Sequence, residues 1–226
     1  MKKLLLLLLF LVAGFSLSAQ NIKSRSIDAK DIISLLRNDG YDLYSFDLND
    51  FMKGDYNVTL YIKEYSKEAG EINSRGFDAG GNKILFSQFT EEEKKAAKEL
   101  GLTKGMKRGI FYKIDRINLA LIPDKVDSLM KFNAEYGNLG AVSQRLKLRP
   151  ISAENVYKYE IRPFVIDNFE SGKFIPLVAI LSWWYDDAAR LFRCCGESML
   201  KADLSANILK NVPHYYVIGI TIKSNK

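Results

Sequence analysis

The order of apolar and polar residues along the chain predicts a few short helices and a larger number of strands. Residues 90–101 carry the clearest helical signal. Thr90 and Glu93 form a capping box there, acidic residues fill the first turn, and Gly101 stands where a helix usually ends. Apolar residues at helical spacing predict three further helices, over 28–39, 123–137 and 205–211.

Segments rich in β-branched and aromatic residues, several of them alternating with polar ones, predict strands. These segments are 56–65, 82–89, 108–122, 156–166, 173–185 and 214–223, of which 108–122 is long enough for one bent strand or two. The sequence GFDAGG at 76–81 indicates a turn, and short connections such as 168–173 favour antiparallel hairpins over parallel crossovers. The predicted fold class is α+β, with an antiparallel β-sheet or sandwich flanked by a few α-helices.

The first residues have the pattern of a secretory signal peptide. Two lysines precede an unbroken apolar run from Leu4 to Val12, and small residues then lead to Ala19. The run is too short to span a bilayer comfortably, and no later segment approaches eighteen consecutive apolar residues. We therefore expect residues 1–19 to be a signal peptide that is cleaved near Ala19–Gln20. We also expect no membrane span in the mature chain, and a periplasmic or secreted protein.

The mature chain has the size and composition of a folded domain. Its 207 residues suit a single α+β domain at 20–226, with a subdomain boundary near 137–152 if there are two smaller units. Hydrophobic residues make up 47% of the chain, which argues against disorder. The net charge of +6 falls to +4 when the signal peptide leaves, and the remaining basic residues are dispersed. Nucleic-acid binding needs a clustered basic patch, so we do not expect it.

Most catalytic and cofactor templates fail on residue counts. The chain has one histidine, His214, and no G-x-S-x-G motif, so a serine or cysteine triad has little support. A zinc site needs three or four close ligands, and the chain offers at most Cys194, Cys195 and His214. No phosphate loop or dinucleotide fingerprint is present, and residues 46–55 fail the calcium-loop motif. We expect no cofactor and no metal, and a structural or merely exposed His214.

The most distinctive stretch is SWWYDDAARLFRCCGE at 182–197. Its two aspartates predict a hairpin with a turn over 186–189, in which Trp183 faces Phe192 and lies in the core while Trp184 is partly exposed. No residue is selected as catalytic. The residues selected for a binding role are Trp184, Tyr185, Asp186 and Asp187.

The two cysteines of this stretch, Cys194 and Cys195, are adjacent, and we expect free thiols rather than a disulfide. Joining them requires a strained or cis peptide at a cost of roughly 3–4 kcal/mol. So short a closed loop yields only about 1 kcal/mol of chain entropy. Gly196 permits a turn here, so a vicinal bridge or a redox role is the alternative.

The signal sequence ending in SAQ and the segment WWYDDAARLFRCCGE resemble a family of exported Gram-negative bacterial proteins known only as a domain of unknown function. The resemblance covers most of the mature chain. It implies no activity and assigns no site residues.

Three classes of function are consistent with these patterns. The lack of a catalytic constellation, the dispersed charge and the many aromatic residues favour a non-enzymatic binding or interaction protein of the bacterial cell envelope, with a protein or glycan ligand. The alternative is a carboxylate-based hydrolase of carbohydrate or cell-wall material. An aromatic cleft with two carboxylates about 5–10 Å apart would support it. An assembly subunit would instead show a large apolar patch or an unpaired strand edge.

Overall fold

The computed structural model describes residues 29–50, 54–101, 103, 106, 109–112, 114–137, 140–151, 155–166 and 170–225. The predicted signal peptide at 1–19 lies outside these residues. The chain divides into two units, residues 1–35 and 36–226, and all the described strands belong to the second unit. Within the described residues, no helix is both long and apolar enough to cross a membrane.

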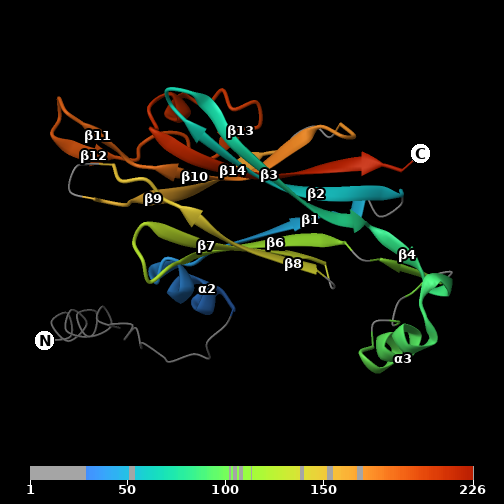
Figure 1. Ribbon diagram of the computed structural model, residues 1–226. Coiled ribbons are helices and arrows are strands. Elements are labelled where there is room, and N and C mark those ends of the chain that lie inside the picture. The colour runs from blue at the N-terminus through green and yellow to red at the C-terminus, as the bar shows by residue number, and fades with distance from the viewer. Residues whose placement is uncertain are drawn as a thin grey trace, which may run out of the picture. The chain divides into compact units, whose positions relative to one another are not determined.

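The two larger sheets of the second unit have four and six strands (Figure 1). The four-stranded sheet has the order β1-β6-β7-β8, with β1 at Asp42–Asp47, β6 at Arg116–Pro123, β7 at Leu129–Tyr136 and β8 at Gly140–Lys147. The six-stranded sheet has the order β13-β9-β10-β14-β2-β3, with β13 at Leu200–Lys201, β9 at Tyr159–Val165, β10 at Phe174–Ser182, β14 at His214–Ser224, β2 at Tyr56–Ser66 and β3 at Gly70–Gly81. All pairings in these sheets are antiparallel except that of β13 with β9.

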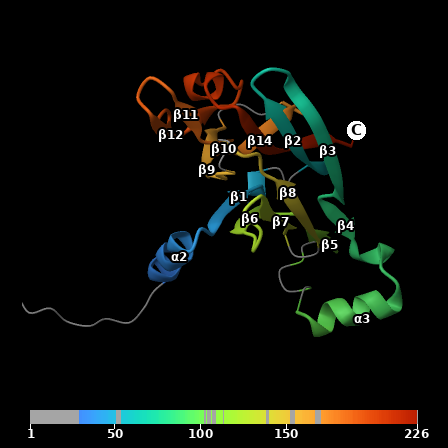
Figure 2. The same ribbon diagram turned by 60° about the vertical axis from the view of Figure 1, so that its left-hand side comes forward.

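The remaining elements are short. Two small sheets pair β4 (Lys83–Leu85) with β5 (Ile110–Tyr112) and β11 (Trp184–Asp186) with β12 (Leu191–Arg193). Among the described residues, the helices are α2 (Ala29–Asn38) and α3 (Glu91–Glu99), with 3₁₀ turns η2 (Phe86–Gln88) and η3 (Asn207–Lys210). Figure 2 shows α3 apart from the two sheets, beyond β4 and β5. Antiparallel sheets with a few helices confirm the predicted α+β class.

Apolar residues from the facing sides of the two sheets form the main core. Its buried residues include Leu60, Leu119, Phe132 and Ile218, each at most 1% exposed. A second cluster covers the other face of the six-stranded sheet and includes Phe164, Leu181, Leu200, Leu209 and Val217. Strand β10 lies between the two clusters and is buried from Ile175 to Ser182. Burial on both faces explains why its sequence is a continuous apolar run.

The capping box predicted for residues 90–101 is present at the start of α3. The Thr90 hydroxyl accepts a hydrogen bond from the Glu93 amide at 3.2 Å, and the Glu93 carboxylate accepts one from the Thr90 amide at 2.8 Å. Gly101 follows the helix with a φ of +69°, which glycine adopts without a steric penalty. The prediction for 205–211 is confirmed only as the single turn η3.

The helix predicted over 123–137 is wrong. The chain instead ends β6 at Pro123, turns, and forms β7, which pairs with β6 on one side and β8 on the other. Val126, Leu129, Met130 and Ala134 have helical spacing by coincidence. The signal that prevails is the alternation of buried Phe132, Ala134 and Tyr136 with Lys131, Asn133 and Glu135.

Two local predictions around the β3–β4 region also need correction. GFDAGG at 76–81 is not a turn, because it forms the last half of edge strand β3, where glycines are tolerated beside a bulge. The strand predicted over 82–89 ends at Leu85. The Gln88 side chain accepts a hydrogen bond from the Leu85 amide at 3.1 Å and stabilises η2 instead.

Candidate functional site

The predicted hairpin at 182–197 forms, but its register differs from the prediction. Tyr185, not Trp183, pairs with Phe192, and the turn occupies 187–190. Arg190 takes a φ of +53°, so the turn closes one residue later than a turn over 186–189 would. The chain also breaks at Trp183 between β10 and β11, which removes Trp183 from the predicted pairing.

The four residues selected for binding lie together on this hairpin, away from any described cavity. Trp184 is half-buried and packs against the second core cluster, and Tyr185 is exposed with its ring edge against Phe192. Asp186 accepts a hydrogen bond from the Ala189 amide at 3.1 Å, and Asp187 is exposed. A binding role for Trp184, Tyr185, Asp186 and Asp187 stays a prediction.

Trp183 is not a core residue, contrary to the prediction. It is half-buried and belongs to neither core cluster. The Lys158 ammonium lies 5.2 Å from the centroid of its ring, a cation–π contact. The neighbouring Trp184, and not Trp183 as predicted, packs against a core cluster.

Both cysteines are free thiols in the structure. Cys195 is exposed, and Cys194 is half-buried beside Glu160. Burial, followed by the hydrogen bond to Glu160, raises the pKa of the Cys194 thiol above its ordinary value. Arg162 is buried and donates hydrogen bonds to the carbonyl oxygens of Cys194 and Glu197, which fixes this loop on the six-stranded sheet.

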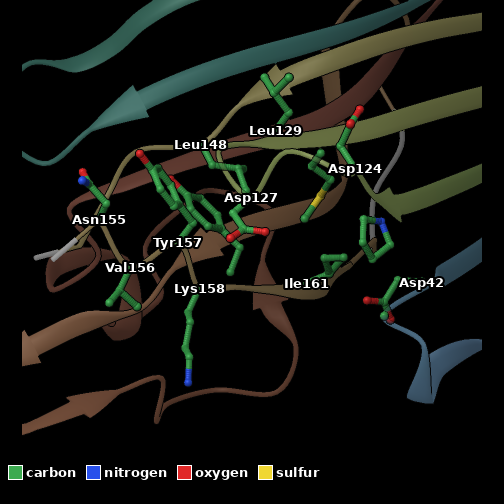
Figure 3. Close-up of a pocket in the computed structure, with 14 residues that line it drawn as sticks. Asp42, Asp124, Asp127, Leu129, Leu148, Asn155, Val156, Tyr157, Lys158 and Ile161 are labelled. Carbon is green, nitrogen blue, oxygen red and sulfur yellow. The ribbon is translucent and has the colours of Figure 1, made fainter.

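A pocket of about 490 Å³ lies where the β6–β7 turn and the described parts of the β8–β9 connection, residues 148–151 and 155–158, meet the start of β9 (Figure 3). Its volume is within the range of roughly 300–1,000 Å³ that is typical of small-molecule sites. Aliphatic side chains such as Leu129, Leu148 and Ile161 form much of the wall. The polar and aromatic lining residues include Asp42, Asp124, Asp127, Tyr157, Lys158 and Tyr159.

Acidic groups dominate the charge of the pocket. Figure 3 shows Asp127 among the labelled side chains near the centre of the view, and Asp42 on the side opposite Tyr157. The third carboxylate, Asp124, pairs with Arg145 at 3.2 Å between Oδ2 and Nε. The ammonium of Lys158 extends away from the other labelled side chains, toward Trp183. Asp127, together with Asp42, whose charge the nearby Arg37 offsets in part, therefore gives the pocket a negative character.

Two of the carboxylates have pKa values shifted in opposite directions. Burial raises the pKa of Asp42, and the positive charge of Arg37 opposes this rise only in part. Burial also acts to raise the pKa of Asp124, but the hydrogen bond from the Val126 amide and the charge of Arg145 outweigh it, so the net shift is downward. No group of three or more histidine, cysteine or acidic residues in the described ranges is placed to hold a metal ion.

Behind the pocket wall, His214 is the centre of a buried hydrogen-bond network. Its side chain is 2% exposed, Nδ1 lies 2.6 Å from the hydroxyl of Tyr159, and Nε2 lies 3.1 Å from Oε1 of Glu64. The Tyr159 hydroxyl also accepts a hydrogen bond from the Arg149 amide at 2.9 Å. The Arg149 guanidinium lies 3.3 Å from the same Glu64 oxygen. Tyr159 thus belongs to both the pocket and the network.

The sequence analysis predicted a functional role for none of the residues that line the pocket. Asp42 lies 82 positions before Asp124, and only the pairing of β1 with β6 brings the two segments together. The alternation of Tyr157 and Tyr159 around Lys158 was the one available signal, and it indicated a strand without indicating a site. His214 was expected to be structural or exposed, and it is buried.

Comparison with known proteins gives a family and no function. Neither the curated proteins nor the solved structures include a match to this chain. A family model described as a domain of unknown function, DUF5041, matches residues 13–224, which is nearly the whole chain. The protein therefore belongs to the DUF5041 family, as its resemblance to a domain of unknown function indicated.

Proposed function

We propose that the protein is an exported, non-enzymatic binding protein of the bacterial cell envelope, and that its pocket binds a short neutral glycan. The observation that carries the proposal is a pocket of about 490 Å³ lined by two tyrosines, aliphatic side chains and the carboxylates of Asp42 and Asp127. Aromatic rings provide flat apolar contact area, and carboxylates accept hydrogen bonds from hydroxyl groups. Export is proposed from the lysine- and leucine-rich start of the chain.

The charge of the pocket narrows the class of glycan. Asp42 and Asp127 line it, and Lys158 extends toward Trp183 instead of neutralising them. An acidic sugar would meet like charges, which disfavours its binding. A neutral oligosaccharide avoids this repulsion and still offers hydroxyl donors to both carboxylates.

Calorimetric titration of the mature protein with the trisaccharides chitotriose, cellotriose and maltotriose tests the proposal. We expect at least one to bind, and the variants Tyr157→Ala and Asp127→Asn to weaken binding at least about tenfold, equivalent to ~1.4 kcal/mol. Tyr185→Ala, on the β11–β12 hairpin, is the matched control and should leave the affinity unchanged. The pocket proposal is wrong if no trisaccharide binds with a Kd below about 1 mM, or if only Tyr185→Ala weakens binding.

A carboxylate-based hydrolase is the second candidate, and one observation favours it. Asp42, with a raised pKa, and Asp124, with a lowered pKa, line the same pocket, as expected of a proton donor and an ionised partner. The ion pair of Asp124 with Arg145 argues against a free catalytic base. Reducing-sugar release from the three trisaccharides, lost in Asp42→Asn, would establish the hydrolase in place of the binding protein.

A further inference from the structure

The His214 network connects three separate segments of the chain. Glu64 comes from β2, Arg149 from the β8–β9 connection and Tyr159 from β9, and all three meet around the first residue of β14. The amide of His214 is also held, because it donates to the Ser182 hydroxyl at 3.2 Å. Tyr159 is the member of this network that lines the pocket.

The hydrogen bonds assign the proton positions of the neutral histidine. A carboxylate only accepts hydrogen bonds, so Nε2 carries the proton that is donated to Glu64. Nδ1 then accepts from the Tyr159 hydroxyl, and the Tyr159 oxygen accepts from the Arg149 amide. In this arrangement Nε2 of His214, the Tyr159 hydroxyl and the Arg149 amide each have an acceptor within the network.

Protonation of His214 disturbs this arrangement at one place. Nδ1 becomes a donor and aims its new proton at the Tyr159 oxygen, so the hydroxyl proton of Tyr159 loses its acceptor. A buried donor without a partner is destabilising. The new positive charge also lies near the Arg149 guanidinium, and only Glu64 offsets it.

The groups that face His214 set its titration. Burial first, and then the charge of Arg149, lower the pKa of His214 below 6.5, and the hydrogen bond and charge of Glu64 counteract them only in part. The rings of Tyr159 and Tyr216 face the imidazole edge-on, with centroids 5.9 and 5.0 Å from it. Burial raises the pKa of both phenols, so both stay protonated wherever His214 titrates.

We propose that His214 is a positioning residue for the pocket: in its neutral form it holds Tyr159 in the wall and the β8–β9 connection at Arg149, and its protonation releases both. The pocket therefore loses its ordered wall, and with it affinity for a glycan, as the pH falls through the titration of His214. The loss of glycan affinity rests on the proposed function. The release of Tyr159 and of the β8–β9 connection concerns the protein alone and can be tested without a ligand.

The chain has a single histidine, so one NMR signal reports His214 without assignment work. We expect its titration midpoint to lie below 6.5 in the mature protein. Over the same pH interval, the protection of the Arg149 amide against hydrogen exchange should fall, because that amide donates to Tyr159. Protection that stays constant while His214 titrates would overturn the proposal.

Two variants separate positioning from general stability. Arg149→Gln removes the cation that disfavours protonation, so the His214 midpoint should move to higher pH. The loss of order in the connection, measured by exchange of the Ile151 amide that donates to the Val156 carbonyl, should move with it. Lys223→Gln removes a positive charge at the other end of β14, where the side chain is exposed, and should leave both unchanged. If Arg149→Gln moves the His214 midpoint while the loss of order stays at the wild-type pH, the coupling is refuted.

Glycan affinity measured across the same pH range then tests whether protonation of His214 weakens glycan binding. For any trisaccharide that binds at pH 7.5, the affinity should fall with the His214 midpoint in both the wild type and Arg149→Gln. An affinity that is independent of pH would refute the link to binding. If no trisaccharide binds, the proposed function fails, while the exchange data still decide the positioning role of His214.

Discussion

Removing one oxygen atom, in Tyr159→Phe, isolates the contribution of the His214 network to stability. The phenylalanine ring preserves the packing of Tyr159 but leaves Nδ1 of His214 without a donor. The histidine side chain is 2% exposed, so water cannot easily replace the lost hydroxyl. An unsatisfied buried acceptor costs about 1–3 kcal/mol. The Arg149 amide adds little to this cost, because it is exposed and can bond to water.

We therefore expect Tyr159→Phe to lower the free energy of unfolding at pH 7.5 by about 1–3 kcal/mol. Urea denaturation followed by tryptophan fluorescence measures the change. Tyr185→Phe is the matched control, since its ring is 42% exposed, and its effect should stay within about 0.5 kcal/mol. Equal effects of the two substitutions would refute the account of the network.

The network also predicts how stability depends on pH. Since the folded pKa of His214 lies below its unfolded value, the contribution of His214 is fully present above pH 6.5 and is lost as the pH falls through the folded pKa. The unfolding free energy of the wild type should therefore decrease over that interval. In His214→Asn, which has no titrating imidazole, this part of the decrease should be absent.

Three further predictions concern other parts of the chain. Alkylation after denaturation without reductant should add two labels, and in the native state Cys195 should react before the half-buried Cys194; no labels would mean that the cysteines are bridged. Gly196→Ala should destabilise the protein more than Gly172→Ala, because a Cβ at Gly196 would lie 2.7 Å from Cβ of Ile208 while one at Gly172 meets nothing within 4 Å; equal unfolding free energies would contradict this. N-terminal sequencing of protein recovered from the periplasm or medium should begin near Gln20, and recovery of Met1 from a membrane fraction would refute export.

The sequence predicted correctly those parts of the fold that depend on residues close together in the chain. The capping box at Thr90, the apolar run of β10 and the alternation of β2 depend on neighbouring residues, and these predictions are confirmed. The helix expected over 123–137 was wrong because helical spacing and strand alternation coexist there, and only pairing with β6 and β8 decides between them.

The pocket could not be predicted from the sequence, because strand pairing, and not local sequence, creates it. Asp42, Asp127 and Tyr159 come from segments far apart in the chain, and sheet pairing brings them together without leaving a local pattern. The hairpin at 182–197 drew attention because its unusual residues are adjacent. Its aspartates, however, have structural surroundings, with Asp186 bonded to the Ala189 amide. The most unusual residues of the sequence, at 182–197, therefore do not line the pocket.

The proposed function places ligand binding at the pocket beside the β8–β9 connection. Amide NMR spectra of residues 20–226, recorded during titration with chitotriose, cellotriose and maltotriose, show which residues the ligand contacts. We expect shifts concentrated at Gly40, Asp127 and residues 155–159, which line the pocket. Shifts confined to residues 184–187 of the hairpin, or no shifts with any of the three sugars, would contradict it.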